Sequence, residues 1–144
     1  MITIKPFEYK PMEHEAERAS NGYLMSLVAV IVGLPLPIVN LIATFFFFVG
    51  NRNSTYFARW HTTQALLSQL ILLGFNSVGF WWTIDIFIRG REEVNNLYIS
   101  YMLVLLVINI IEFITTMYTA TKTRNGVHVE WWLFGDITHL IVKK

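Results

Sequence analysis

Long stretches without charged residues constrain this chain more than any other feature of its sequence. There is no Asp, Glu, Lys or Arg from Ala19 to Asn51 or from Trp60 to Ile84, and Glu112 is the only one from Leu97 to Thr121. A helix needs about 20 mainly apolar residues to cross a bilayer. Only 15% of all residues are charged, whereas soluble domains have about a quarter. The sequence therefore predicts an all-α integral membrane protein.

The first uncharged stretch is long for one span and short for two. Its middle holds Gly33, Pro35 and Pro37, and the two prolines remove amide donors and break a helix there. The pieces on either side, 21–34 and 38–49, would each be about 20 Å long, less than the about 30 Å of a hydrocarbon core. Two arrangements remain, either one broken and tilted span or a short re-entrant hairpin.

The positions of the lysines and arginines favour the hairpin. Cytoplasmic loops carry an excess of these residues. Three true spans would divide them almost evenly, whereas a re-entrant first segment places nine of the eleven on the side of both termini. The N-terminus has no basic-then-apolar signal peptide, so the first apolar segment is expected to act as an internal anchor. We predict two long transmembrane helices in a bacterial inner (plasma) membrane, with both termini in the cytoplasm.

The two ends of the chain differ in composition from the membrane domain, which is expected at 20–122. Residues 1–19 form a polar tail that is extended at its prolines and then forms a short surface helix near 13–20. Residues 123–144 mix aromatic and charged side chains and are too short and too polar to span. They are predicted to form an amphipathic segment that lies in the membrane interface.

Polar residues form two lines along the helix predicted to start near residue 56. His61, Gln64 and Ser68 share one face, and Gln69 and Asn76 lie beside them. Lipid cannot satisfy such groups, so they are expected to face protein or water. The small residues on this helix also permit close approach of another helix. It is therefore predicted to be the surface that contacts a partner protein.

A second polar face, formed by Asn109 and Glu112, is predicted on the last long helix. A carboxylate at the centre of a membrane helix costs about 2.5–3.5 kcal/mol on insertion scales, so Glu112 is expected to face protein or water. A proton or substrate site is one interpretation. The favoured one is structural, a hydrogen bond between helices to Gln64, His61 or Arg59.

Motifs that carry chemistry are missing from the sequence. Cysteine is absent, and the four histidines show neither HxxxH nor HExxH spacing, so no metal site is predicted. There is no GxSxG motif, no Gly-rich phosphate loop and no close pair of carboxylates in an apolar setting. No catalytic residue and no cofactor are expected, and the protein is predicted not to be an enzyme. The net charge is only +1, so the sequence does not show the excess of basic residues that is typical of nucleic-acid-binding proteins.

The stretch RWHTTQALLSQ, residues 59–69, resembles the signature of the Tic-twenty-like superfamily of small membrane proteins. That superfamily includes the channel-associated subunit of the chloroplast inner-envelope protein translocon and many small bacterial membrane proteins. The preceding residues 33–57 resemble its bacterial branch, and the likeness covers roughly residues 20–120. It implies a helical membrane architecture, termini on the cytoplasmic side, and a translocon-associated role in protein transport.

Two functions are consistent with these features. The preferred one is a non-enzymatic small subunit that packs against a larger membrane complex, with protein translocation or insertion machinery as the expected complex. The alternative is an independent small channel or carrier that acts as a homo-oligomer, because two full spans are too few to enclose a pore alone. Expected partners are membrane lipids, a larger complex of unknown identity and other copies of the chain, but not nucleic acid.

Overall fold

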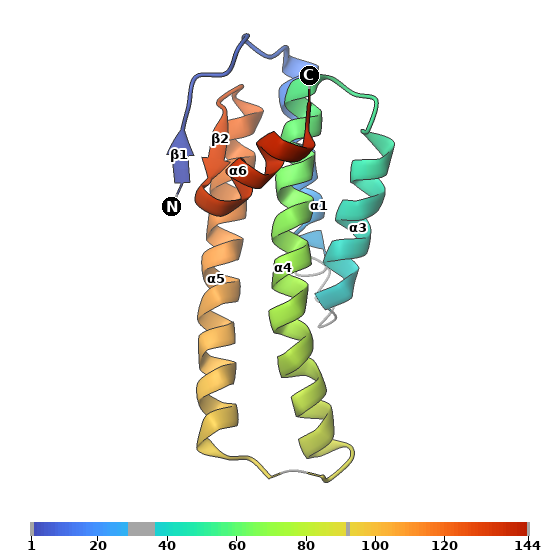
Figure 1. Cartoon of the computed structure of the whole chain (residues 1–144), viewed down its shortest axis with the longest axis vertical. Coiled ribbons are helices and arrows are strands. Elements are labelled where there is room, and N and C mark those ends of the chain that lie inside the picture. The colour runs from blue at the N-terminus through green and yellow to red at the C-terminus, as the bar shows by residue number, and fades with distance from the viewer. Residues whose placement is uncertain (1, 29–36, 92, 144) are drawn as a thin grey trace.

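The computed structural model describes residues 2–28, 37–91 and 93–143. In these residues the protein is mostly helical, with five helices and one small antiparallel sheet of two strands (Figure 1). The elements are β1 (Ile2–Ile4), α1 (Glu13–Met25), α3 (Pro37–Gly50), α4 (Tyr56–Phe87), α5 (Asn96–Arg124), β2 (Val129–Trp131) and α6 (Trp132–Ile141).

Helices α4 and α5 form the long axis of the molecule, as the uncharged stretches predicted. Both are long and apolar enough to cross a membrane, and few residues of their apolar windows are buried within the chain. Helix α5 starts at an N-cap, because the side chain of Asn95 accepts a hydrogen bond from the Tyr98 amide (2.8 Å). Lys122 and Arg124 in its last turn complement the negative end of the helix dipole.

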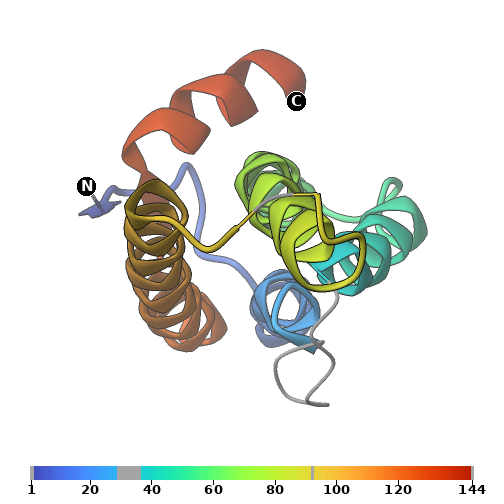
Figure 2. The same ribbon diagram turned by 90° about the horizontal axis from the view of Figure 1, so that it is seen from below.

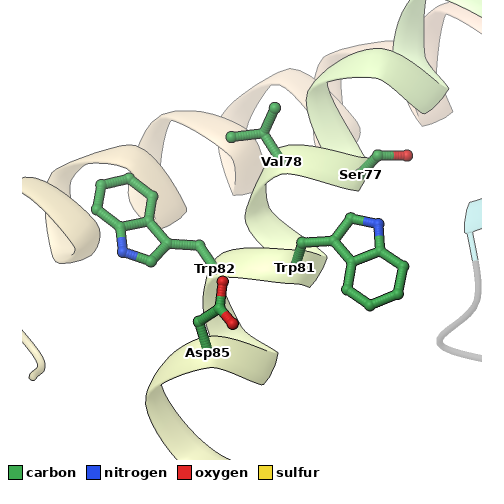
Figure 3. A pocket seen from close by; sticks show the side chains of 5 residues that line it. All are labelled: Ser77, Val78, Trp81, Trp82 and Asp85. Carbon is green, nitrogen blue, oxygen red and sulfur yellow. The ribbon is translucent and has the colours of Figure 1, made fainter. Parts of the chain in front are cut away.

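The end of α4 farthest from the chain termini carries an aromatic band. Figure 3 shows Trp81 and Trp82 pointing away from each other, with Asp85 below them. Arg89 pairs with Asp85 (2.8 Å) and its guanidinium lies 5.7 Å from the centre of the Trp81 ring. The shallow hollow at this place, of about 410 Å³, is lined by residues of α4 alone. Such a band is typical of a membrane interface.

Helix α1 packs in the groove between α4 and α5 near their upper ends, and α3 packs against α4 (Figures 1 and 2). The predicted helix near 13–20 is longer in the structure and continues to Met25. Gly22 permits the close approach of α1 to α4, because a Cβ at this position would lie 2.7 Å from Thr62 Cγ2. Helix α3 begins at Pro37, a residue that suits the first turn of a helix. Pro35 and the predicted hairpin tip lie outside the described residues.

The two ends of the chain meet in a small sheet, which the all-α prediction did not include. Strand β1 pairs with β2 in an antiparallel register that places Ile2, Thr3 and Ile4 opposite Trp131, Glu130 and Val129. Helix α6 follows directly and crosses the upper part of α4 and α5 on the side opposite α1 (Figure 2). The C-terminal part thus contains a strand and a short helix. A strand of three residues is too short for its alternation to stand out in a sequence.

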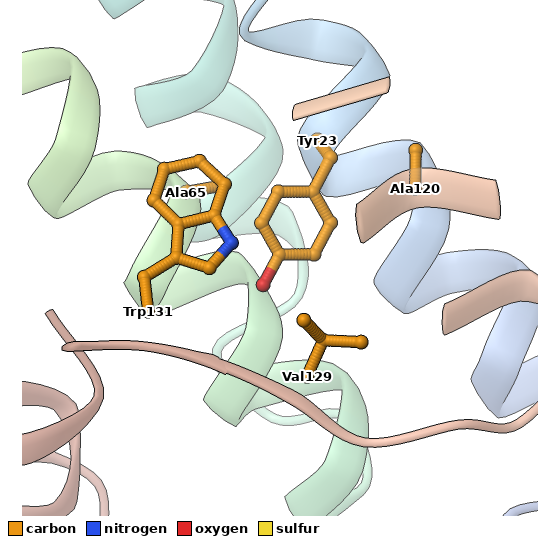
Figure 4. Packing of buried hydrophobic residues seen from close by; sticks show 5 residues of the cluster. All are labelled: Tyr23, Ala65, Ala120, Val129 and Trp131. Atoms are coloured by element: carbon orange, nitrogen blue, oxygen red, sulfur yellow. The ribbon is translucent and has the colours of Figure 1, made fainter. Parts of the chain in front are cut away.

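The core lies where these elements meet. Figure 4 shows Tyr23 of α1, Ala65 of α4, Ala120 of α5, and Val129 and Trp131 of β2 packed together. The indole N–H of Trp131 is satisfied by Thr119 Oγ1 (2.8 Å), as a buried tryptophan requires. The packed core therefore occupies one end of the α4–α5 pair.

Candidate functional site

A buried polar network runs through this core. It joins Tyr23 of α1 and His61 and Gln64 of α4 to His128 and Glu130 at β2, and all five residues are buried. Buried polar groups are costly unless they are hydrogen-bonded, so the direction of each bond can be worked out in turn.

The backbone of β2 fixes the starting point of the network. The Trp131 amide donates to Gln64 Oε1 (3.0 Å), and Gln64 Nε2 donates to the Val129 carbonyl (3.2 Å). The carboxamide of Gln64 is therefore oriented, and its Nε2 also donates to the Tyr23 hydroxyl (2.7 Å). The Tyr23 hydroxyl in turn donates to His61 Nδ1 (2.8 Å).

The two buried histidines continue the same direction. Because His61 Nδ1 accepts, its hydrogen lies on Nε2 and is donated to His128 Nδ1 (3.1 Å). His128 Nε2 then donates to Glu130 Oε1 (3.0 Å). This network assigns neutral histidines that carry their hydrogen on Nε2. Burial lowers the pKa of His128 and outweighs the opposite effect of Glu130, which agrees with the neutral form.

Glu130 is the acceptor at the end of the network. Its Oε1 also accepts from His139 Nε2 of α6 (2.9 Å), while its Oε2 pairs with the ammonium group of Lys5. His139 Nδ1 accepts from the Trp60 indole N–H (3.4 Å), so His139 also carries its hydrogen on Nε2. Burial alone would raise the pKa of Glu130, but the hydrogen bonds from Lys5, His139 and His128 together lower it to about 2.

Aromatic rings surround the histidines. Trp60 lies 4.4 Å and Phe7 4.7 Å from the ring centre of His128, and Phe57 lies 4.5 Å from that of His61. These rings shield the network from solvent on the α4 side. The two outer partners of Glu130 are open to solvent, since the side chains of His139 and Lys5 are 45% and 50% exposed.

The end of the network has the composition of a metal site. One ligand atom each from His128, Glu130 and His139 lies within 4.8 Å of the others. The sequence predicts no metal site because the spacing of these three residues matches neither HxxxH nor HExxH. His128 and Glu130 are two residues apart, a spacing that places both on one face of a strand, but β2 is too short to be identified as a strand from the sequence.

A second polar cluster joins α4 and α5 farther along the bundle. Gln69 Nε2 donates to Glu112 Oε1 (2.8 Å), and Thr116 donates to the same oxygen (2.9 Å). Asn76 and Asn109 exchange amide hydrogen bonds of 3.2 and 2.9 Å. The partner of Glu112 is thus Gln69 and not Gln64, His61 or Arg59, because the His61 and Gln64 face of α4 is turned toward α1 and β2.

The face of α4 that was predicted to contact a partner protein is buried inside the chain. Ala65 is fully buried, and Ser68 is buried and donates to the Ala65 carbonyl (2.8 Å). Arg59 donates to the Lys143 carbonyl (3.2 Å) near the C-terminus. The prediction of a docking surface here was wrong, because α1 and β2 of the same chain cover it.

The model of the magnetosome magnetite crystal formation protein family matches residues 19–136 of the chain. Comparisons with curated proteins and with solved structures find no match. The family match corrects the resemblance to the Tic-twenty-like superfamily, and the translocon association and protein-transport role taken from it were wrong. In the structure, His61 and Gln64 of the resembling stretch serve internal packing against β2, which carries no information about transport.

Proposed function

Because the chain belongs to the magnetosome magnetite crystal formation protein family, we propose that it is a non-enzymatic membrane subunit that takes part in magnetite crystal formation. The match to residues 19–136 carries this proposal, since it includes α3, α4, α5 and β2 completely. The proposed location is the membrane that encloses the crystal, and the proposed role is an assembly with a larger membrane complex.

The two long helices support a membrane location. Helix α4 has 32 residues and α5 has 29, which correspond to about 48 and 44 Å, more than the about 30 Å of a hydrocarbon core. A helix that crosses upright would therefore extend beyond the hydrocarbon core. The aromatic band at Trp81 and Trp82 fits one interface, and the buried network at the opposite end fits the other. The exposed apolar side chains between them include Leu70, Phe75, Val104, Val107 and Ile111.

The proposed topology has two spans, with both termini and the network in the cytoplasm. The sheet of β1 and β2 places both chain ends at one end of the bundle, where the excess of lysine and arginine belongs. We propose that the first uncharged segment enters the membrane from that side as a re-entrant hairpin with α3 as its second piece, and that α6 lies in the interface through Trp132 and Leu140, which are exposed.

The distribution of polar and apolar surface supports a subunit role. The intramembrane polar groups Gln69, Glu112 and Asn109 are hydrogen-bonded within the chain. The outward face of α3 is apolar and exposes Ile42 and Phe46. A surface of this kind suits packing against another membrane protein.

The test uses a magnetite-forming bacterium whose chromosomal copy is replaced by a tagged, full-length version. Deletion should reduce the size or number of crystals in electron micrographs, and the tagged chain should fractionate with magnetosome membranes. Mild-detergent purification should recover different membrane proteins together with the chain. Recovery of the chain alone as an oligomer would favour the channel or carrier alternative. Normal crystals after deletion would refute the proposed role.

Topology is tested separately, because the chain has no cysteine. Single cysteines at the exposed positions Lys10, Asn53 and Glu93 can be treated with a membrane-impermeant thiol reagent. The proposal expects Glu93→Cys to react from one side and Lys10→Cys and Asn53→Cys from the other. Reaction of Asn53→Cys on the side of Glu93→Cys would indicate three spans.

A further inference from the structure

We propose that His128, Glu130 and His139 form a binding site for a divalent first-row transition metal ion. The three ligand atoms lie within 4.8 Å of one another and come from two adjoining elements, β2 with its preceding residue and α6. This inference rests on the geometry of the three side chains and is independent of the proposed function.

The backbone arrangement brings the three side chains together. His128 and Glu130 are two residues apart on an extended segment and therefore share a face. Helix α6 then turns back over them, and Gly135 makes this possible, because a Cβ there would lie 3.1 Å from Glu130 Cβ. The tight packing at Gly135 lets α6 present His139 to the same carboxylate oxygen that His128 contacts.

The donor set identifies the class of ion. Two imidazoles and one carboxylate suit Fe²⁺, Zn²⁺ or Co²⁺, whereas Mg²⁺ and Ca²⁺ prefer oxygen ligands alone. Three protein ligands leave at least one position open to water or to another ligand.

The surroundings hold the ring of His128 in the way usual for metal-binding histidines, whereas the neighbour of His139, the Trp60 indole, can only donate a hydrogen bond. The second nitrogen of His128 faces His61 Nε2 (3.1 Å), and that of His139 faces Trp60 Nε1 (3.4 Å). Binding requires each ring to move its hydrogen from Nε2 to Nδ1. The His128 hydrogen is then donated to His61 Nε2, and the His61 hydrogen moves to Nδ1 and is donated to the Tyr23 hydroxyl, which turns its own hydrogen away from His61. No proton leaves the protein. The long Trp60 contact is given up.

Lys5 already occupies one side of the site as an internal cation. Its ammonium group pairs with Glu130 Oε2, and an incoming ion must displace it. The path of entry lies on this side, because the side chains of Lys5 and His139 are 50% and 45% exposed, whereas those of His128 and Glu130 are 3% and 5% exposed. Removal of Lys5 should therefore strengthen binding, although removal of a ligand should weaken it.

The experiment uses the full-length chain, purified in mild detergent through an affinity tag without histidine and stripped with a chelator. Titration with Co²⁺ is followed by its visible absorption, with Zn²⁺ as a competitor and Fe²⁺ tested without oxygen. We expect about one ion per chain. Mutation of a residue that only supports a metal ligand typically weakens metal binding by about 10–100-fold. His139→Ala should weaken Co²⁺ binding by more than this, because it removes a ligand. His14→Ala is the control, since His14 is exposed on α1 away from the site.

Lys5→Gln is the variant that separates binding from folding. A variant that only damages the fold loses affinity, whereas Lys5→Gln should bind Co²⁺ at least as tightly as the original chain. The proposal is overturned if Co²⁺ does not bind stoichiometrically, if His139→Ala binds like His14→Ala, or if Lys5→Gln binds more weakly. Because crystal formation and topology are measured in other experiments, failure here would leave the proposed function standing.

Discussion

Glu130→Gln should destabilise the fold strongly at neutral pH and only slightly near pH 2. The substitution keeps the size of the side chain but removes the charge that His128, His139 and Lys5 share. A glutamine oxygen can still accept from one histidine. Its amide group, however, offers nothing to Lys5.

The magnitude follows from the pKa of Glu130, which is lowered from its ordinary 4.5 to about 2. At about 1.4 kcal/mol for each pKa unit, this difference sets an upper bound of about 3 kcal/mol. Lys5 is half exposed and solvent screens its charge, so we expect about 1–3 kcal/mol. A lowered carboxyl pKa stabilises the fold fully above pH 4.5, and this stabilisation is lost as the pH falls toward about 2.

The assay is unfolding in detergent, followed by circular dichroism from neutral to acid pH. Both proteins should lose stability below about pH 6.5, because burial lowers the pKa of His128 and only the unfolded chain gains that proton readily. The difference between them should shrink toward zero between about pH 4.5 and 2. Glu17→Gln is the control, because the Glu17–Arg124 pair is exposed on both sides. A difference that stays constant with pH would refute the electrostatic reasoning.

Three further perturbations test the packing of the helices. Gly22→Ala should destabilise the fold by about 1–3 kcal/mol, because α4 leaves no space for the added Cβ. Gly74→Ala, where nothing lies within 4 Å of the added Cβ, should stabilise the fold by up to about 1 kcal/mol. Thermal melts in which both variants shift the melting temperature in the same direction would contradict this. Glu112→Leu should lower the free energy of unfolding by about 1–3 kcal/mol, because Gln69 loses its acceptor, and Glu112→Gln should lower it clearly less. The amount of folded protein in the membrane measures this difference. Asn95→Ala should cost about 1 kcal/mol through the lost N-cap, and should raise hydrogen exchange only in the first turn of α5.

The sequence by itself determined the two long helices and the polar residues within them. Their lengths follow from the missing charges, and α4 starts at Tyr56 and α5 at Asn96, within a residue of expectation. Apolar length and the placement of polar residues along it are local properties of the chain, so they can be read from the sequence without knowledge of the packing. The same local reasoning identified Gln69, Asn109 and Glu112 as polar residues that need partners, and the structure provides them.

Only the tertiary structure decided which polar face meets which neighbour. The packing of α1 between α4 and α5 turns His61 and Gln64 toward β2 and leaves Gln69 for Glu112. Likewise, Lys5 reaches Glu130 because β1 pairs with a strand near the other end of the chain. Pairing across such a separation depends on how the helices between the two strands fold back, and neither three-residue strand carries a local pattern that specifies its partner.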